Sequence, residues 1–218
     1  MTDETRRLER DQVIEASLAH VPFDGWSWKA LEAGAVDCAA DAKLARRLFT
    51  GPADAADHFA DWADRRMLAE LETMKLDEMR IRDRIYACVK TRILLNAEYK
   101  EALRHLLSFL ALPHNLPLAS KLTWRTCSLM WYAAGDTSAD WNHYTKRGLL
   151  APVYSSTVLY WMGDAGDGEG DFPETWGYLE RRIDDVLKTF SLPRRLKERL
   201  GKLPRPPFGR RTGSAARV

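Results

Sequence analysis

Apolar residues recur along this 218-residue chain at intervals of three and four, which is the period of an α-helix. Alternating β-branched runs, the pattern of strands, are absent, and glycine and proline fall mostly between the helical stretches. We therefore expect an all-α fold, with about nine or ten helices in one bundle. The pattern places helices at about residues 5–19, 27–36, 41–49, 54–75, 77–95, 97–110, 117–135 and 138–162, and another from residue 171 onward.

A helix-turn-helix-like headpiece is predicted for residues 1–50, where three short helical stretches include a tight turn between the second and the third. A DNA-reading helix presents polar groups at its N-terminal end, close to phosphates. The third stretch instead begins at Asp41 and lies near Asp37, and acids in that place repel phosphates. We therefore interpret the headpiece as structural and expect no nucleic-acid partner. Residues 51–190 are predicted to form the helical bundle.

The C-terminal tail, residues 191–218, carries most of the positive charge. It has nine Lys and Arg and one acid, a net charge of +8, so residues 1–190 carry about −6 of the total of +2. A helix in the tail has a leucine face and a basic face, as in interfacial membrane helices, and is followed by a flexible end. The alternative is that this helix folds back on the bundle. The residues predicted to contact an anionic membrane are Leu192, Arg194, Arg195, Leu196, Lys197, Arg199, Leu200 and Leu203.

No apolar run approaches the roughly 18–20 residues that span a bilayer, and the N-terminus shows no signal-peptide pattern. We therefore expect a cytoplasmic protein, associated peripherally with the inner face of the cytoplasmic membrane. Cys38, Cys88 and Cys127 are odd in number and far apart, so we expect three buried free thiols.

The sequence offers no catalytic or metal-binding set. None of its five histidines has a partner at the spacing of zinc ligands, and no nucleophile elbow, phosphate loop or dinucleotide fingerprint is present. The glycine-rich stretch 163–170 is acidic, but it lacks the closing Glu of a calcium loop, so a flexible linker is expected there. We expect no enzyme activity, no cofactor and no metal.

Residues 112–162 stand out, because two aromatic-rich helical stretches flank a short polar joint at 134–138. Directly after the joint, Asp140, His143, Tyr144 and Arg147 are spaced to form one stripe of a helix, which suggests a docking surface for a protein.

The bulky aromatics of this stretch, together with a helix that Pro152 should kink, can leave an apolar cavity for a small molecule. The residues predicted to line such a lipid-binding cavity are Leu107, Leu110, Trp131, Leu150, Tyr154 and Trp161.

Four short sequence motifs resemble those of a known family. They are LPHN at 112–115, W-x-x-AGD-x-S-x-D at 131–140, N-x-YT-x-R at 142–147 and DFPETWGYLERRIDD at 171–185. In this order they resemble the lipid-binding accessory proteins of ubiquinone biosynthesis, the ninth Coq protein. The resemblance runs from about residue 13 to residue 190, and the unprocessed-looking N-terminus together with an Ala- and Arg-rich composition suggests a bacterial member.

The resemblance implies the all-helical fold and the homodimer of TetR-type regulators, with an internal lipid pocket in place of DNA reading. It implies a protein that is not an enzyme and that touches membranes through its C-terminal amphipathic helix. It also implies a partner, the di-iron demethoxyubiquinone hydroxylase. The hydroxylase docks on the family's polar stretch, which corresponds here to Asp140, Asn142, His143, Tyr144 and Arg147.

The expected function is therefore non-catalytic: binding a polyprenyl quinone precursor at the membrane and presenting it to that hydroxylase. The alternative is a ligand-responsive TetR-type DNA-binding repressor.

Overall fold

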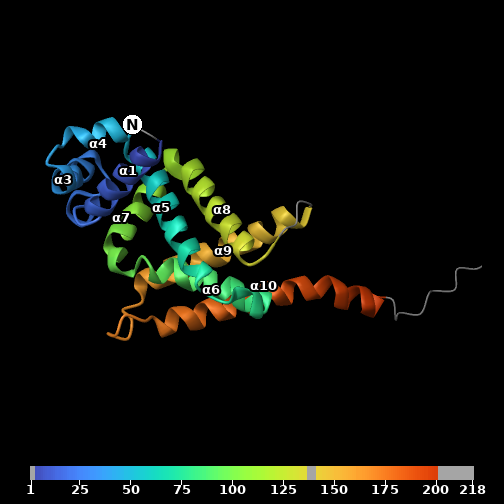
Figure 1. Ribbon diagram of the computed structural model, residues 1–218. Helices are drawn as coiled ribbons and strands as arrows, with labels where there is room; N and C mark the ends of the chain where they lie inside the picture. The colour runs from blue at the N-terminus through green and yellow to red at the C-terminus, as the bar shows by residue number, and fades with distance from the viewer. Residues whose placement is uncertain (1–2, 137–140, 201–218) are drawn as a thin grey trace, which may run out of the picture. The chain divides into compact units, whose positions relative to one another are not determined.

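The structure, a computed structural model, describes residues 3–136 and 141–200, and for residues 141–143 and 189–200 it describes the backbone alone. All regular elements in these ranges are helical, which confirms the all-α class (Figure 1). The α-helices are α1 (Asp3–Ser17), α2 (Val21–Asp24), α3 (Trp28–Ala39), α4 (Lys43–Leu48), α5 (Pro52–Glu72), α6 (Ile81–Leu94), α7 (Lys100–Leu110), α8 (Leu116–Ala133), α9 (Trp141–Gly163) and α10 (Pro173–Leu200). Three short 3-10 turns join them, at Leu76–Glu78, Ala97–Tyr99 and Pro113–Asn115.

Local sequence signals explain several helix starts. The Ser27 side chain accepts a hydrogen bond from the backbone N–H of Ala30 at 3.5 Å and so caps α3. Pro52 and Pro117 lie in the first turns of α5 and α8, where a missing N–H costs no helical hydrogen bond. Pro152 lies inside α9, and the helix continues through it. The kink expected there stays a prediction.

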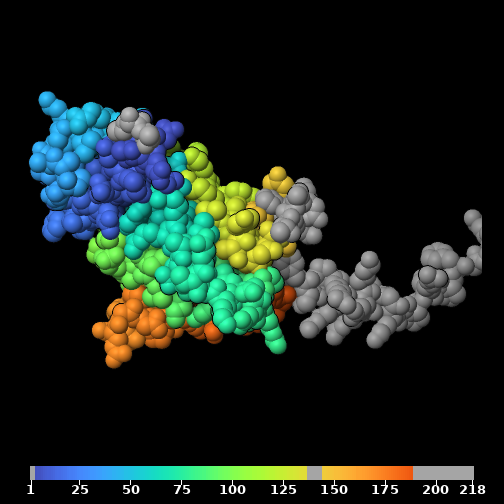
Figure 2. Space-filling view, viewed as in Figure 1, coloured from blue at the N-terminus to red at the C-terminus, as the bar shows by residue number. Residues whose placement is uncertain are grey.

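The chain divides into two compact units, Met1–Ile183 and Asp184–Val218, and α10 runs across the division. In the first unit, helices α1 to α4 gather at one end, as Figure 2 shows in blue. Their core is continuous with α5 and α7, because Val13, Leu31 and Phe49 belong to the same buried cluster as Phe59 and Leu106. The expected boundaries at residues 50 and 190 stay predictions.

Helices α1 and α3 approach each other closely at Gly34. A Cβ atom at this position would lie 2.3 Å from Ser17 Oγ and 2.5 Å from the Ser17 backbone nitrogen. The missing side chain of glycine is therefore what allows the two helices to pack so closely.

The tail is not a separate helix, because the helical turns expected from Leu192 onward are the end of α10, which continues unbroken to Leu200. Pro193 accordingly lies inside a helix. Among the described residues, no helix combines the length and the apolar character needed to cross a bilayer.

One smaller expectation is wrong. Cys38 is exposed, although Cys88 and Cys127 are buried as expected. The glycine-rich stretch before α10 is a hydrogen-bonded loop, because Asp167 accepts the backbone N–H groups of Glu169 and Asp171 at 2.9 and 3.1 Å, and its expected flexibility stays a prediction. Its three inner glycines, Gly166, Gly168 and Gly170, have positive φ angles that side chains rarely adopt, which explains their presence in so tight a loop.

Candidate functional site

A cavity of about 310 Å³ lies within the first unit, between helices α5, α6, α7, α8 and α9, and we call it the α5–α9 cavity. Most of its wall is apolar, and leucines of α7 and α8 supply the largest share. A cavity of this size falls at the lower end of the range for small-molecule sites, roughly 300–1,000 Å³. Its lining residues are Phe59, Ala60, Arg92, Ile93, Leu103, Leu106, Leu107, Leu110, Ala111, Leu116, Ala119, Leu122, Thr123, Thr126, Tyr154, Ser155, Val158, Leu159 and Trp161.

The exposure of the lining residues distinguishes a mouth from an inner end. Leu116 and Leu159 are 51% and 63% exposed, so the cavity opens near them. Arg92, Thr126 and Trp161 are 6%, 3% and 0% exposed, so they line the part of the wall farthest from solvent. The mouth is therefore apolar and the inner end carries polar groups.

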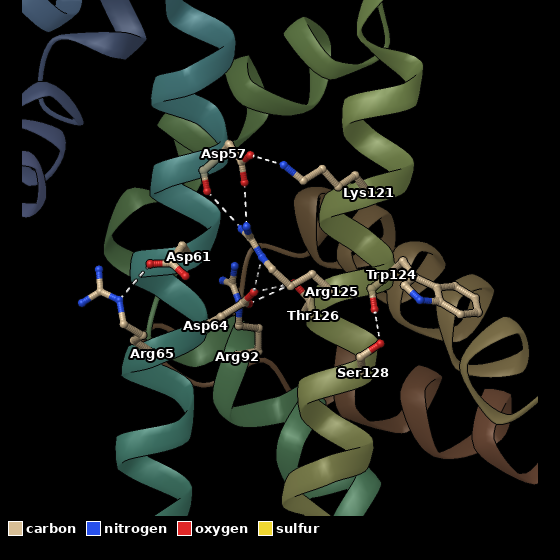
Figure 3. A network of polar contacts seen from close by, with 10 residues as sticks. All are labelled: Asp57, Asp61, Asp64, Arg65, Arg92, Lys121, Trp124, Arg125, Thr126 and Ser128. Atoms are coloured by element: carbon tan, nitrogen blue, oxygen red, sulfur yellow. Dashed lines mark hydrogen bonds and ion pairs between the residues drawn. The ribbon is translucent and has the colours of Figure 1, made fainter. Parts of the chain in front are cut away.

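A buried ion pair forms part of the inner end. The Arg92 Nε atom of α6 donates to Asp64 Oδ1 of α5 at 2.9 Å, and the Asp64 side chain is 1% exposed. The Thr126 hydroxyl of α8 reaches the two Asp64 carboxylate oxygens at 2.9 and 3.1 Å. Figure 3 shows these three side chains converging from three helices. A buried charge needs partners of this kind, because burying it alone costs several kcal/mol.

Further charges continue this network toward the surface. Arg125 of α8 lies 3.5 Å from Asp64 through its Nε atom, and its Nη1 atom donates to Asp57 Oδ1 at 2.6 Å (Figure 3). Lys121 Nζ donates to the other Asp57 oxygen at 2.5 Å. Partial burial would raise the pKa of Asp57, but the hydrogen bonds from Lys121 and Arg125 outweigh it and hold the pKa below its ordinary value. The network therefore fastens α5 to α8 along one wall of the cavity.

Beside this ion pair, burial keeps one tyrosine and two cysteines of the surrounding helices in their neutral forms. Burial raises the pKa of the Tyr154 hydroxyl, although the nearby Arg92 guanidinium opposes the shift. Burial also raises the pKa of Cys88 and of Cys127 to about 12, so neither thiol is a nucleophile at neutral pH. Among the described residues, no cluster of His, Cys, Asp and Glu has the arrangement of a metal site.

Four of the six residues predicted to bind lipid line the cavity: Leu107, Leu110, Tyr154 and Trp161. The other two, Trp131 and Leu150, do not line it, and Leu150 is 4% exposed in the packed interior. Whether any of the six contacts a lipid stays a prediction.

The predicted docking stripe is only partly described. Asp140 lies outside the described residues, as do the side chains of Asn142 and His143. Tyr144 is 61% exposed, and its ring stacks on Trp124 of α8 with the centroids 6.2 Å apart. Tyr144 is therefore accessible to a partner.

Arg147 differs from the expectation of an exposed stripe, because it is 4% exposed. Its Nε atom donates to Ser128 Oγ of α8 at 3.1 Å, and its Nη1 atom lies 3.5 Å from Asp136 Oδ2. Helical spacing placed Arg147 on the stripe, but α8 covers that turn of α9, and the side chain joins the two helices.

The predicted membrane-contact residues cannot be placed. The side chains of Leu192, Arg194, Arg195, Leu196, Lys197, Arg199 and Leu200 lie outside the described residues, and Leu203 lies outside them altogether.

The polar residues of the inner end, Asp64, Arg92 and Thr126, were missed by the sequence analysis. A signal was present, because Asp64 interrupts the apolar stripe of α5 formed by Ala60, Ala63 and Met67. An acid within such a stripe must be buried, and it then needs a buried cation, which Arg92 supplies.

Comparison with known proteins connects this geometry to a family. The COQ9 family model matches residues 116–189, which include α8, α9 and most of α10. The chain is 30% identical over 206 residues to the human protein named "Ubiquinone biosynthesis protein COQ9, mitochondrial", covering 89% of this chain and 62% of the human protein. A probable coq9 protein of Dictyostelium discoideum is 23% identical over 197 residues, covering 87% and 63% of the two chains. This chain thus spans less than two thirds of the length of these relatives.

The fold has a solved counterpart in a TetR transcriptional regulator from Nitrosomonas europaea. The two share a TM-score of 0.64 and 22% sequence identity, over 82% of this chain and 97% of the regulator. At this identity the likeness concerns the fold alone, and it confirms the TetR-like arrangement of helices. The matches together confirm the resemblance that the sequence words indicated: the chain is a relative of the COQ9 proteins, and residues 116–189 carry the sequence pattern of that family.

Proposed function

We propose that this chain is a non-catalytic accessory protein of ubiquinone biosynthesis that binds a polyprenyl quinone precursor and presents it to the demethoxyubiquinone hydroxylase at a membrane. The observation that carries the proposal is the α5–α9 cavity, with its apolar wall and its volume of about 310 Å³. The names of the relatives, which place those proteins in ubiquinone biosynthesis, support the pathway.

The size of the cavity bears on how a long lipid is held. A volume of about 310 Å³ accepts a ring with a short piece of chain, but not a complete long isoprenoid. The remainder would extend past the exposed leucines at the mouth, Leu116 and Leu159, toward a membrane or a second copy of the chain in a homodimer.

The basic tail is the proposed membrane contact. It carries nine Lys and Arg against one acid, and each basic residue near an anionic leaflet contributes about 1 kcal/mol. A truncation after Phe190 is expected to lose co-sedimentation with anionic liposomes. Equal pelleting of the full chain and the truncated chain contradicts this part of the proposal.

The lipid content of the purified protein tests the function directly. We expect mass spectrometry of an organic extract to find an isoprenoid or quinone lipid in proportion to the protein. An Ala119→Leu variant, which places a larger side chain in the cavity wall, is expected to carry less of the same lipid. Absence of bound lipid from both proteins contradicts the proposal.

Hydroxylase recruitment has its own test at Tyr144, the exposed member of the docking stripe. Tyr144→Ala is expected to lower co-purification with the hydroxylase several-fold, because an exposed aromatic side chain is a typical interface anchor. Phe23→Ala, which removes an 88% exposed aromatic from the headpiece, is the matched control and should leave recruitment unchanged. Equal recruitment by the wild type and both variants contradicts the docking role.

The rival function, a TetR-type repressor, has the similar fold in its favour. The two arginines of α4, however, form ion pairs within the chain, since Arg46 pairs with Glu32 at 2.6 Å and Arg47 with Asp41 at 2.8 Å. These pairs compete with contacts from the arginines to DNA phosphates. A gel shift with DNA from upstream of the coding sequence distinguishes the two functions, because specific retardation supports the repressor.

A further inference from the structure

An arginine of α6 holds the end of α8 in place. Through its Nη1 atom, Arg84 donates to the Ala134 carbonyl at 3.0 Å. Its Nη2 and Nε atoms donate to the carbonyls of Asp77 and Met79, at 2.8 and 2.9 Å, in the segment that leads into α6. Hydrogen bonds from a charged donor are roughly twice as strong as those between neutral groups. Arg84 therefore ties the C-terminal end of α8 to the start of α6.

The C-terminal end of α8 needs a donor of this kind. Ala134 is the cap residue of α8, and the last carbonyls of a helix have no donor within the helix. These carbonyls form the negative end of the helix dipole, and the last turn of α8 contains no basic residue to stabilise it. The next residue, Gly135, has a φ angle of 88°, and a Cβ atom there would lie 3.0 Å from Arg84 Nη1. Glycine thus allows both the turn and the close approach of the arginine.

Asp136, the next residue of the joint, connects it to α9. Its side chain is 5% exposed and lies 2.7 Å from Lys146 Nζ and 3.5 Å from Arg147 Nη1. Both cations lie within one turn of Tyr144, the exposed member of the docking stripe. A continuous set of contacts therefore leads from Arg84 through the joint to the docking stripe.

Arg84 is placed to influence the docking stripe without contacting a partner itself. Each of its three side-chain nitrogens already donates to a carbonyl of the chain. A binding surface that is ordered before its partner arrives loses less conformational entropy on association. Removing the arginine would release the end of α8 and loosen the joint that leads to Tyr144.

We propose that Arg84 is a positioning residue for partner recruitment, because it fixes the joint between α8 and α9 and so orders the docking stripe in advance. This inference rests on the proposed recruitment of the hydroxylase. It adds a residue that lies outside the stripe, on another helix, and it gives the run Ala134-Gly135-Asp136 a physical purpose.

The test compares Arg84→Met and Arg84→Lys in the full-length protein. Methionine keeps an unbranched side chain and removes every donor, whereas lysine keeps the charge but cannot reach three carbonyls at once. Arg84→Met should weaken binding of the purified hydroxylase about three- to tenfold, as measured by biolayer interferometry, and Arg84→Lys should fall between this variant and the wild type. In Arg84→Met, amide hydrogen exchange should be at least about fivefold faster around Ala134 and at residues 144–150, and unchanged in α3.

The matched control is Arg104→Met. Arg104 Nη2 donates to the Met162 carbonyl at 2.8 Å, so this variant removes a guanidinium–carbonyl bond at the opposite end of α9. Hydroxylase binding should stay within about twofold of the wild type, because the docking stripe is distant along the helix.

A double variant separates positioning from general destabilisation. If Arg84 acts through the stripe, the loss of binding in Arg84→Met combined with Tyr144→Ala should be smaller than the product of the two single losses. Circular dichroism establishes that every variant is folded at the temperature of the binding measurement.

The possible results separate the inference from the function on which it rests. If the wild type and Arg84→Met bind the hydroxylase equally, the inference is overturned and the proposed recruitment stands. Unchanged hydrogen exchange around Ala134, an equal loss of binding in Arg104→Met, or single losses that multiply in full also overturn it. If the wild type does not bind the hydroxylase, the proposed recruitment fails and the inference fails with it.

Discussion

The buried tryptophans on the two sides of α5 differ in the hydrogen bonding of their indole N–H groups. On the headpiece side, Trp26 packs against Phe59 with the ring centroids 5.7 Å apart, and its indole N–H donates to the Pro52 carbonyl at 2.8 Å. On the cavity side, Trp161 is buried just as deeply, but its N–H has no acceptor among the described residues. Phe59 itself belongs to the headpiece core and also lines the cavity. The headpiece core around Trp26 is therefore filled and hydrogen-bonded, whereas Trp161 belongs to the wall of a cavity and its buried N–H has no acceptor among the described residues.

The ion pairs of the two regions differ in their exposure to solvent. In the headpiece half, Asp11 accepts two hydrogen bonds from Arg65, at 2.7 and 3.0 Å, at a site that is partly open to solvent. The neighbouring His58 contacts Asp11 at 2.7 Å, and burial together with Arg10 lowers the pKa of His58, although Asp11 opposes the shift. Asp64 and Arg92, by contrast, are almost completely removed from water. The cavity half therefore depends on a pair of charges that cannot be separated without penalty.

Removing one member of that pair is expected to have the largest effect. Asp64→Ala leaves the Arg92 charge buried without its partner, so the free energy of unfolding should fall by about 3–5 kcal/mol. Urea denaturation monitored by circular dichroism measures the loss.

Two controls define this result. The double variant Asp64→Leu/Arg92→Met removes both charges and should return to within about 1 kcal/mol of the wild type. Lys29→Ala breaks an exposed headpiece pair with Asp24 and should change stability by less than about 0.5 kcal/mol. A loss of less than 1 kcal/mol for Asp64→Ala alone would show that the buried charge is tolerated and would remove the contrast.

Enlarging a side chain should have a smaller effect on the free energy of unfolding, and the effect should differ between the headpiece core and the cavity wall. Ala30 is 1% exposed in the headpiece core, so Ala30→Leu overpacks a filled space and should cost about 1–3 kcal/mol. Ala119 lines the cavity, so Ala119→Leu can occupy empty space and should change stability by less than about 1 kcal/mol. Thermal unfolding of the two variants side by side provides the comparison. Equal losses would mean that the cavity wall is as tightly packed as the headpiece core.

The sequence predicted the regular parts of this comparison well, because helical periodicity is a local signal. The long helices α5, α6 and α8 follow from spacing alone, whereas the short helix α2 was not predicted. The cavity could be expected only in outline. Its polar end depends on Asp64 and Arg92, which are 28 positions apart and meet only after α5 and α6 have packed together.

The docking stripe shows the limit of the same reasoning. Spacing correctly places Tyr144 and Arg147 on neighbouring turns of α9, but it cannot tell which turn the next helix covers. Contact with α8 through Ser128 buries Arg147, while Tyr144 one turn earlier remains exposed. Arg147→Glu would therefore test the joint between α8 and α9 and not a direct contact with a partner.

The smallest expected effect on stability concerns the start of α10. The Asp164 carboxylate accepts the backbone N–H of Thr175 at 3.0 Å and its hydroxyl at 2.6 Å, so it caps the first turn of α10. Slight burial would raise the pKa of Asp164, but the hydrogen bonds from Thr175 and Gly166 outweigh it and lower the pKa. A carboxylate whose pKa is lowered by folding stabilises the protein above its unfolded pKa of about 3.9, and this stabilisation disappears as the pH falls further.

Asp164→Asn keeps one acceptor oxygen but removes the charge, so it should cost about 0.5–1 kcal/mol at pH 5–7. The difference from the wild type should shrink as the pH falls from about 4 toward 3, because the wild-type carboxylate then also loses its charge. Urea unfolding of both proteins at pH 3, 4, 5 and 7 measures this difference in stability. The control is Asp77→Asn, a change at an exposed acid, which should have little effect at any pH. A difference that stays constant or grows on acidification would show that the charge of Asp164 does not stabilise α10. The loop would then hold the helix by its backbone geometry alone.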